Sequence, residues 1–452
     1  MYRSLSLAAL LLAAEPPSSA GGLSFTDARE RARQTHPAIL SSRLAAQAAR
    51  ERVNGTGAWD DPVVGAQLWQ IPLDNVENAL VPGLTPAQRA TTVAMGPSMV
   101  NVMLMAQQTF PWPGKRFAQR NEAGALAEQA AASTEVMRAD VDRAVAYAYG
   151  DLIAAQGSIA VLEQDRTVLE TLVALSDSRL ASGSGSRVDA LAARAELEGL
   201  QRELIDVRQA VRTAKARLAA LIGADGPDAV PDAAHTFLIR PLPPREELLA
   251  RALTQRPESR IAAAGVRAAL ARLSQARMAM IPDVTANVSY MIGVGGPGDY
   301  AKHGAVHTIL GPPDMVTVGV AVPLPVLAPW KQMPQADAAR VEHKRAQAEA
   351  DAIARTVQAE VDQALAGVDM ARSHLELHST RLIPLDIAGV DAARAAYESG
   401  QGSLVDLVVA GRSLRGHHLE SQTALLQYAR YVADLERATG VPLNAFGEGG
   451  TP

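Results

Sequence analysis

The chain contains no cysteine, which excludes disulfide bonds and a lipid anchor on an N-terminal cysteine. Aromatic residues are also scarce, at 4% of the 452 residues, whereas apolar residues make up 48%. Most of the apolar excess is Ala, Leu and Val, a composition typical of long, closely packed helices. The net charge of -5 offers no basic face for a nucleic acid. We therefore predict a helical protein without a nucleic-acid partner.

Patterns that carry catalysis are missing as well. The sequence has no nucleophile placed with a base, no phosphate-binding loop and no paired carboxylates in a pocket-forming context. It therefore predicts a protein that is not an enzyme and needs no cofactor.

The N-terminus carries a short apolar run from Leu5 to Ala14, after a single charge at Arg3. This run is too short to span a bilayer and fits a secretory signal, with cleavage after Ala20. We expect residues 1–20 to be a signal peptide and the mature chain to leave the cytoplasm.

The two halves of the chain are copies of each other. A shift of 217 residues places Ser182–Asp189 on Ser399–Asp406, and eight of the sixteen positions from Ser182 to Leu197 are then identical. This period is too long for a solenoid repeat and indicates a duplicated unit. We expect a first repeat at 21–223, a linker at 224–244, a second repeat at 245–441 and a loose C-terminal tail at 442–452.

Long helices dominate each half. No proline occurs from Gly114 to Gly226, and apolar residues recur there at helical spacing. A helix from Lys115 to Leu180 would be roughly 100 Å long. Its repeat, Gln335–Glu398, contains Pro384, which should kink or interrupt it. A shorter helix is expected at the start of each half, at Phe25–Val53 and Arg245–Met280.

Four segments alternate apolar with small or polar residues, as Val288 does with Thr285 and Val318 with Thr317. Most have the 9 to 11 residues that a tilted strand needs to cross an outer membrane. A soluble sheet half-buried on a core is the alternative. The predicted strands are Val63–Ile71, Val100–Phe110, Val284–Ile292 and Val316–Val322.

Tryptophans favour the membrane interpretation. All four lie near the ends of predicted strands, where an interfacial aromatic belt would lie: Trp59, Trp69, Trp112 and Trp330. Four strands cannot close a barrel, and open edges in lipid are costly, so the chain must oligomerise. Two copies would give a filled eight-stranded barrel, and three would give twelve strands and a lumen. The loops at Pro72–Pro97 and Gly293–Asp314 should face outside the cell.

Several motifs resemble the TolC-type outer-membrane efflux channels over almost the whole mature chain. They are TFPWPGKR at Thr109–Arg116, the glycine-turn segment Arg381–Val408, and the half-ending motifs Leu218–Gly223 and Leu435–Gly440. The first looks most like the branch paired with heavy-metal exporters. The resemblance implies a homotrimer in which each chain gives four strands to a twelve-stranded transmembrane β-barrel and long coiled-coil-like helices to a periplasmic tunnel.

Two glycine turns are candidate functional positions. Gly183 and Gly185 precede Ser186 and Asp189, and the second repeat has the same pattern. A serine followed three residues later by a carboxylate is a helix-capping pattern. The corresponding residues of the second repeat are Gly400, Gly402, Ser403 and Asp406.

The resemblance adds a second role, because these turns would form the periplasmic mouth of the tunnel. Asp406 matches a position in the family's aspartate rings, and Tyr397 matches its gate tyrosine. Gly402 stands where a well-known member has a gate arginine, and Val409 replaces its second aspartate. A single ring at Asp406 is therefore expected without the ionic latch.

Two further groups have the chemistry of metal ligands. His374 and His378 are four residues apart, too few for a complete site, and a solvated pair is favoured. Four methionines cluster around the second strand, where thioethers suit Cu(I) but flexible packing is favoured. They are Met95, Met99, Met103 and Met105.

Together with the resemblance, these features predict the passive outer-membrane channel of a tripartite efflux system that extends into the periplasm, with metal cations as a candidate substrate class. Its expected partners are a periplasmic adaptor protein, an inner-membrane pump of the resistance-nodulation-division type and outer-membrane lipid. The alternatives are a secreted helical scaffold and a stand-alone porin.

Overall fold

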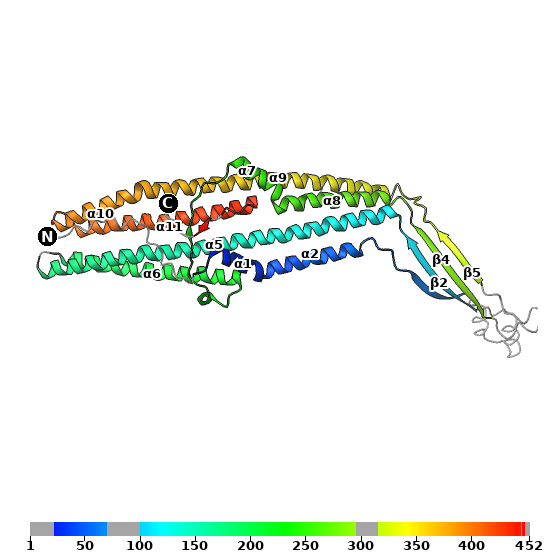
Figure 1. The fold of residues 1–452 in the computed structure, drawn as a ribbon, viewed down its shortest axis with the longest axis horizontal. Coiled ribbons are helices and arrows are strands. Elements are labelled where there is room, and N and C mark those ends of the chain that lie inside the picture. Colours follow the sequence, from blue (N-terminus) through cyan, green and yellow to red (C-terminus); the bar gives the residue numbers. More distant parts are fainter. Residues whose placement is uncertain (1–21, 70–99, 184, 295–314, 444, 448–452) are drawn as a thin grey trace, which may run out of the picture. The chain divides into compact units, whose positions relative to one another are not determined.

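The computed structural model describes residues 22–69, 100–183, 185–294, 315–443 and 445–447 (Figure 1). The predicted signal peptide and most of the two predicted outward-facing loops lie outside these residues. The chain divides into two compact units. Unit 1 comprises residues 1–49, 127–264 and 347–452, and unit 2 comprises 50–126 and 265–346.

The fold is mainly helical, and each half repeats the same order of elements, as predicted. The long helix α5 runs from Pro113 to Ala181, close to its predicted bounds. One stretch of α5 is long and apolar enough to cross a membrane, but half of it is buried by protein. The remaining helices are α1 (Phe25–Thr35), α2 (Pro37–Gly55), α6 (Arg187–Ile222), α7 (Arg245–Gln255), α8 (Pro257–Met278), α9 (Gln332–Leu377), α10 (Ile383–Glu398) and α11 (Leu404–Thr439).

The first helix of each half is broken where the sequence predicted one continuous helix. His36 and Arg256 have extended backbones, with ψ angles of 121° and 130°. Each precedes a proline, Pro37 or Pro257, whose ring disfavours helical geometry at the residue before it. The break therefore recurs at the same place in both repeats.

Pro384 interrupts the second long helix, as expected. A π-helical segment, His378–Leu382, separates α9 from α10, and Pro384 lies in the first turn of α10. Proline lacks an N–H group and cannot continue the hydrogen-bond pattern of the preceding turn.

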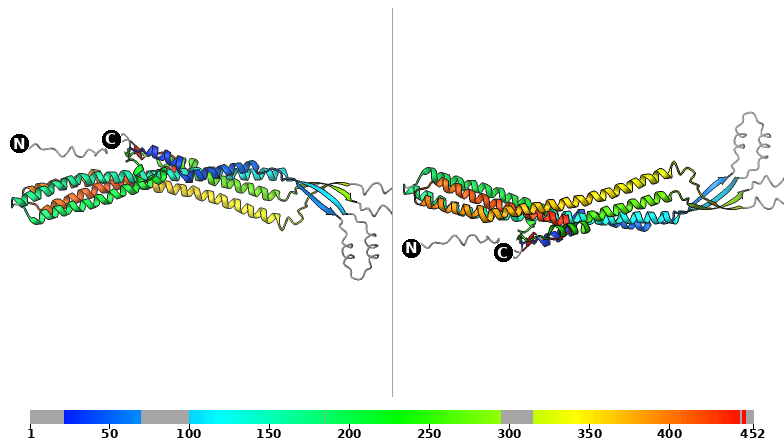
Figure 2. Two further views of the ribbon diagram at one scale, coloured as in Figure 1. Left: turned by 90° about the horizontal axis from the view of Figure 1, so that it is seen from below. Right: turned by 90° about the horizontal axis from the view of Figure 1, so that it is seen from above.

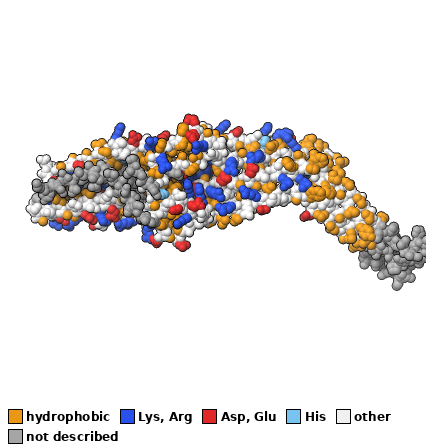
Figure 3. Space-filling model, viewed as in Figure 1, with side chains coloured by type: hydrophobic (Ala, Val, Ile, Leu, Met, Phe, Trp, Pro, Cys, Tyr) orange, Lys and Arg blue, Asp and Glu red, His pale blue; other side chains and the backbone are white. Residues whose placement is uncertain are grey.

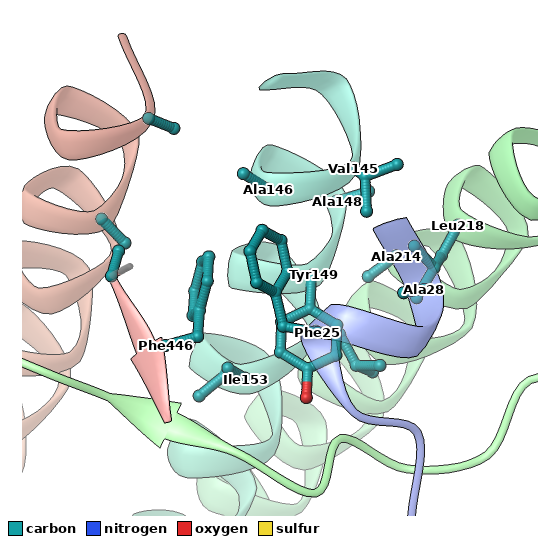
Figure 4. Packing of buried hydrophobic residues seen from close by; sticks show 14 of the residues in the cluster. Phe25, Ala28, Val145, Ala146, Ala148, Tyr149, Ile153, Ala214, Leu218 and Phe446 are labelled. Carbon is teal, nitrogen blue, oxygen red and sulfur yellow. The ribbon is translucent and has the colours of Figure 1, made fainter. Parts of the chain in front are cut away.

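The main core of unit 1 gathers around Tyr149 of α5 (Figure 4). Its ring packs against Phe25 and Phe446, and its hydroxyl donates a hydrogen bond of 2.8 Å to the Leu23 carbonyl. Phe446 belongs to β6 (Phe446–Gly447), which pairs with β3 (Thr236–Phe237). The prediction of a loose tail is thus wrong for this stretch, because Phe446 is buried and anchors the chain against the linker.

Within unit 1, α5 and α6 form one hairpin and α10 and α11 form another, and the two lie side by side in both views of Figure 2. A second apolar cluster joins them, with Leu162 and Leu172 of α5, Leu200 of α6, and Leu404 of α11. The hairpins are therefore held together by a shared core.

Unit 2 contains a four-stranded antiparallel sheet in the order β1-β2-β4-β5. These strands confirm all four predicted segments, within the described residues. Their bounds are β1 (Val63–Trp69), β2 (Val100–Phe110), β4 (Val284–Val294) and β5 (Met315–Ala321).

Candidate functional site

The sheet of unit 2 has one strongly apolar face. Residues paired across antiparallel strands point to the same side, so the pairs Val288–Val318 and Leu104–Tyr290 lie on one face. Val318 is 76% exposed in the single chain. The side chains of this apolar face are Val64, Ala66, Leu68, Val102, Leu104, Ala106, Phe110, Val284, Ala286, Val288, Tyr290, Ile292, Val316, Val318 and Val320, with Gln108 as the polar exception.

The opposite, polar face carries mostly small and hydrogen-bonding side chains, together with four methionines. The hydroxyls of Thr109 and Thr285 lie 3.3 Å apart across β2 and β4. Asn287 sits so close to Gly319 on β5 that a Cβ there would lie 2.5 Å from the amide oxygen. This division is that of a barrel strand with one lipid face and one lumen face. Hydrophobic side chains gather over the strands in Figure 3.

The tryptophans lie at both ends of this sheet. Trp59, Trp112 and Trp330 come before β1, after β2 and after β5, which the antiparallel pairing places at one end. Trp69 is the last residue of β1, at the other end. The three at the first end are at least half exposed. The arrangement is compatible with the predicted aromatic belt, which stays a prediction.

The Pro-Trp-Pro-Gly segment fixes the passage from β2 into α5. Asp283 accepts hydrogen bonds from the Trp112 backbone N–H at 2.9 Å and from the Lys115 ammonium at 2.8 Å. Burial by itself would raise the pKa of Asp283, but the Lys115 and Trp112 hydrogen bonds lower it. Arg116 donates to the Gly57 carbonyl and lies over the Trp59 ring. The start of α5 is thereby bonded to Asp283, the residue directly before β4.

The glycine turns connect α5 to α6 and α10 to α11. Gly183 and Gly400 have φ angles of 73° and 76°, which only glycine adopts without strain. Gly185 and Gly402 pack where a Cβ would lie within 2.9 Å of Arg179 and Ala396, respectively. All four predicted turn glycines thus serve the turn geometry.

The serine caps are present, but the two turns differ. Ser186 accepts from the Val188 N–H, so Asp189 takes no part in a capping box. Ser403 accepts from the Asp406 N–H at 3.2 Å, and its own hydroxyl donates to the Asp406 carboxylate at 2.8 Å. The Asp406 carboxylate also accepts from the Ser403 backbone N–H at 3.4 Å, which completes a capping box, and Asp406 is exposed. The sequence pattern predicted the same cap twice, and only the second repeat completes it.

Tyr397 joins the two hairpins. It is 4% exposed and belongs to the apolar cluster of Leu172 and Leu404. Arg179, at the end of α5, donates to the Tyr397 carbonyl at 2.9 Å, and its guanidinium lies 4.6 Å from the centre of the tyrosine ring. Arg179 was missed in the sequence because it lies 218 residues from its partner. Tyr397 is therefore held by an arginine of the other hairpin.

A buried charge network links the same hairpins further from the turns. Arg415 of α11 is 9% exposed and contacts Asp165 of α5 at 2.5 Å and Glu196 of α6 at 2.9 Å. Arg412 also pairs with Glu196, which is 4% exposed. Burial alone would raise the pKa of Glu196, but hydrogen bonds from the two arginines lower it. Burial raises the pKa of Asp165, although Arg415 opposes it.

The histidine pair is not a solvated pair. His374 is exposed, but His378 is buried at the start of the π-helical segment, with its ring 5.8 Å from that of His417. No group of three or more His, Cys, Asp or Glu side chains suited to a metal ion occurs in the part of the chain that the structure describes. Met95 and Met99 lie outside the described residues, and Met103 and Met105 lie on the polar face of β2.

Comparison with known proteins agrees with this architecture. Similar solved structures include the outer membrane protein VceC of Vibrio cholerae, with a TM-score of 0.71 and 18% identity, covering 92% of this chain and 96% of that one. The outer membrane channel MtrE of Neisseria gonorrhoeae has a TM-score of 0.68 and 18% identity over 92% and 88% of the two chains. The outer membrane channel CmeC of Campylobacter jejuni has a TM-score of 0.69 and 14% identity, over 92% of this chain and 85% of that one.

These structures show the fold. No curated protein sequence matches the chain. The profile of the family described as outer membrane efflux protein matches residues 28–224 and 248–441, most of both repeats. The chain therefore belongs to the outer membrane efflux protein family, whose members are transport proteins and not enzymes.

Proposed function

We propose that three copies of this chain form the outer-membrane channel of a tripartite efflux system, which exports its substrate passively. The sheet of unit 2 carries this proposal: it has an apolar face, a polar face and two edge strands, β1 and β5. Within the described residues, neither edge strand has a partner on its outer side. Each unpaired backbone group in lipid costs several kcal/mol.

Pairing β1 of one copy with β5 of the next removes these edges. Three copies close twelve strands, whose polar faces surround a lumen wide enough for a solute, whereas eight strands are filled by their own side chains. The apolar face then contacts lipid. The signal peptide at residues 1–20 would direct the chain to the periplasm and outer membrane.

In this proposal the channel is passive, and the energy for export comes from a separate pump. We propose an inner-membrane pump of the resistance-nodulation-division type and a periplasmic adaptor that docks at the hairpin turns. Metal cations are the substrate class to test first, since the segment Thr109–Arg116 resembles the heavy-metal branch. The cross-hairpin contact of Arg179 with Tyr397 supports a closed resting mouth.

Cross-linking between edge strands tests the trimer directly. The chain has no native cysteine, so Gln67→Cys on β1 and Thr317→Cys on β5 can be joined by a short bis-maleimide without background. We expect the double variant to give covalent trimers in outer-membrane fractions, and each single variant to give none. Covalent products confined to one chain, or a chain recovered in the soluble periplasm, would contradict the proposal.

Two measurements separate the alternatives. A secreted scaffold would be extracted without detergent and would run as a monomer on an unheated gel, whereas a barrel trimer should be heat-modifiable. A stand-alone porin would support solute passage in cells that lack the adaptor. The proposed channel should restore export only when adaptor and pump are present.

A further inference from the structure

The polar face of the sheet contains a row of methionines that the sequence alone did not reveal. Met103 of β2 is paired with Met291 of β4, and Met291 is paired with Met315 of β5. The three strands are adjacent in the sheet, as Figure 1 shows. The sequence drew attention to Met103 through its neighbours in the chain, but the other two are almost 190 residues or more away.

Strand pairing brings these three side chains together. Directly opposite residues have Cβ atoms about 4.5–5.5 Å apart, and the unbranched methionine side chain has three rotatable bonds with which to move its sulfur toward a neighbour. Met105, two residues along β2, is a diagonal neighbour of Met291 and leans over Gly65, where an added Cβ would lie 3.5 Å from its sulfur. The thioethers of Met103, Met291 and Met315 can thus converge on one point, whereas Met105 leans toward β1, on the side of β2 away from β4.

Packing alone is a weak explanation for this row. The other residues of the polar face are mostly Thr, Ser, Asn, Gln and Gly, so methionine breaks the pattern of that face. Met315 is 48% exposed, and Met103 and Met291 are partly exposed. A gap-filling methionine would be expected in a core, whereas these face the side that the proposed barrel turns toward its lumen.

We propose that Met103, Met291 and Met315 form a binding site for a soft monovalent metal cation, Cu(I) or Ag(I), on the inner wall of the barrel. Neutral thioethers favour such ions over harder divalent cations. A site without carboxylates binds weakly enough for the ion to leave, which a conducting pathway requires. Binding of the ion by the three methionines does not depend on the proposed function, but the place of the site on the inner wall of a barrel and its role in transit do.

Equilibrium binding to the purified full-length protein tests the site. Ag(I) is titrated calorimetrically in chloride-free nitrate buffer, and Cu(I) is titrated anaerobically against a chromophoric chelator. We expect about one Ag(I) per chain, and at least about tenfold weaker binding when Met103, Met291 and Met315 are all replaced by Leu. Leucine keeps the size and apolar character, so the barrel should assemble. Met291→Leu alone, the centre of the row, should also weaken binding.

Matched variants separate this site from other thioethers. Met370→Leu removes an exposed methionine of α9, and a Met95→Leu, Met99→Leu variant removes the two that precede β2. Both should bind Ag(I) as the parent does. Wild-type affinity in the triple variant, loss of binding only in the Met95 and Met99 variant, or no Ag(I) binding by the parent would overturn the site. Cu(I) X-ray absorption should show sulfur neighbours that disappear in the triple variant.

These results stay separate from the test of export. Loss of Ag(I) binding in the methionine variants with export unchanged would support the site and deny it a role in transit. A trimer that exports nothing but binds Ag(I) at the row would leave the site intact and contradict the proposed function.

Discussion

Glu196 shows how a carboxylate can be retained in the contact between the two hairpins. It is almost fully buried, yet Arg412 and Arg415 both donate to it, so the charge is compensated from the neighbouring hairpin. Burying an uncompensated carboxylate would cost far more than any single hydrogen bond returns. The ion pairs of Glu196 with the two arginines therefore favour one alignment of α6 and α11. Their net contribution to stability is smaller than their geometry suggests, because burying the charges is costly.

Replacing Glu196 by Gln should lower stability in a pH-dependent way. The pKa of Glu196 is below its ordinary value in the folded protein, so its contribution is present above about pH 4.3 and is lost as the pH falls through the lowered pKa. We expect the variant to be about 2 kcal/mol less stable at pH 7. The difference from the parent should shrink below about pH 4.

Thermal unfolding followed by circular dichroism from pH 7 to pH 3 measures this difference. Glu198→Gln, an exposed neighbour on α6, is the matched control and should change little at any pH. The parent must be measured alongside, because the pKa of Asp165 is raised by burial, and its contribution therefore changes stability with pH in the opposite direction. A constant deficit across the pH range would assign Glu196 a packing role only.

At the scale of elements, glycines set how closely helices approach. Gly367 of α9 lies against the ring of Tyr431 of α11, so closely that an added Cβ would overlap the ring. Gly199 of α6 has nothing within 4 Å of the same position. The two glycines look alike in the sequence, because the difference lies entirely in the neighbouring helix.

Gly367→Ala should therefore destabilise unit 1 by about 1–3 kcal/mol through overpacking. Gly199→Ala should stabilise it by about 0.5–1 kcal/mol, because alanine is the better helix former. Chemical denaturation measures whether each variant is less or more stable than the parent. Adding Tyr431→Ala to Gly367→Ala should recover part of the loss, and failure of this rescue would show that the ring is not the obstacle.

The strands allow a matched pair of charge insertions. Val318 lies on the apolar face opposite Val288, and Thr317 lies on the polar face opposite Ser289. Val318→Arg should cost roughly 2–4 kcal/mol if it lies near the bilayer midplane, and Thr317→Arg much less. The yield of heat-modifiable trimer in the outer membrane reports the difference. Thr317 is a better control than Thr285, whose hydroxyl bonds to Thr109. Equal loss at both positions would remove the lipid-face assignment.

At the scale of the whole molecule, the order of elements could be predicted because it rests on local signals. Proline-free apolar periodicity marked α5, alternation marked the strands, and Pro384 marked the interruption before α10. The prediction of one continuous helix from Phe25 to Val53 was wrong for a reason visible in the sequence, because a proline at Pro37 disfavours helical geometry at the residue before it. The prediction of a loose tail at Phe446 failed for a different reason. The burial of Phe446 depends on Tyr149 and Phe25, which are far away in the chain.

The long-range contacts of the candidate sites could not be predicted from the sequence for that second reason. Arg179 meets Tyr397, Arg415 meets Asp165, and Met103 meets Met291 only after the two repeats pack together. Duplication explains why: each half supplies one side of every such contact, so neither half shows it alone. Positions that a local pattern could mark, such as the glycine turns and serine caps, were found at the predicted residues.

Asp406 combines a local role in helix capping with a proposed role in the assembled trimer. In the proposed trimer, three copies of this exposed carboxylate would approach one another at the mouth of the tunnel. Their closely spaced negative charges would attract cations and slow their passage. The same carboxylate completes the cap of α11 with Ser403. Asp406→Asn keeps an acceptor for the cap and removes the charge, whereas Asp406→Ala also loses the cap, at about 1 kcal/mol.

We expect Asp406→Asn to change cation block and conductance of the reconstituted channel with little loss of trimer. Asp406→Ala should show the same change in conductance together with lower stability. Asp189→Asn is the control from the other repeat, where the carboxylate takes no part in a capping box. Single-channel recording with and without divalent cations provides the readout. If Asp406→Asn conducts and is blocked as the parent is, the carboxylate serves the cap alone, and closure of the mouth must rest on contacts such as that of Arg179 with Tyr397.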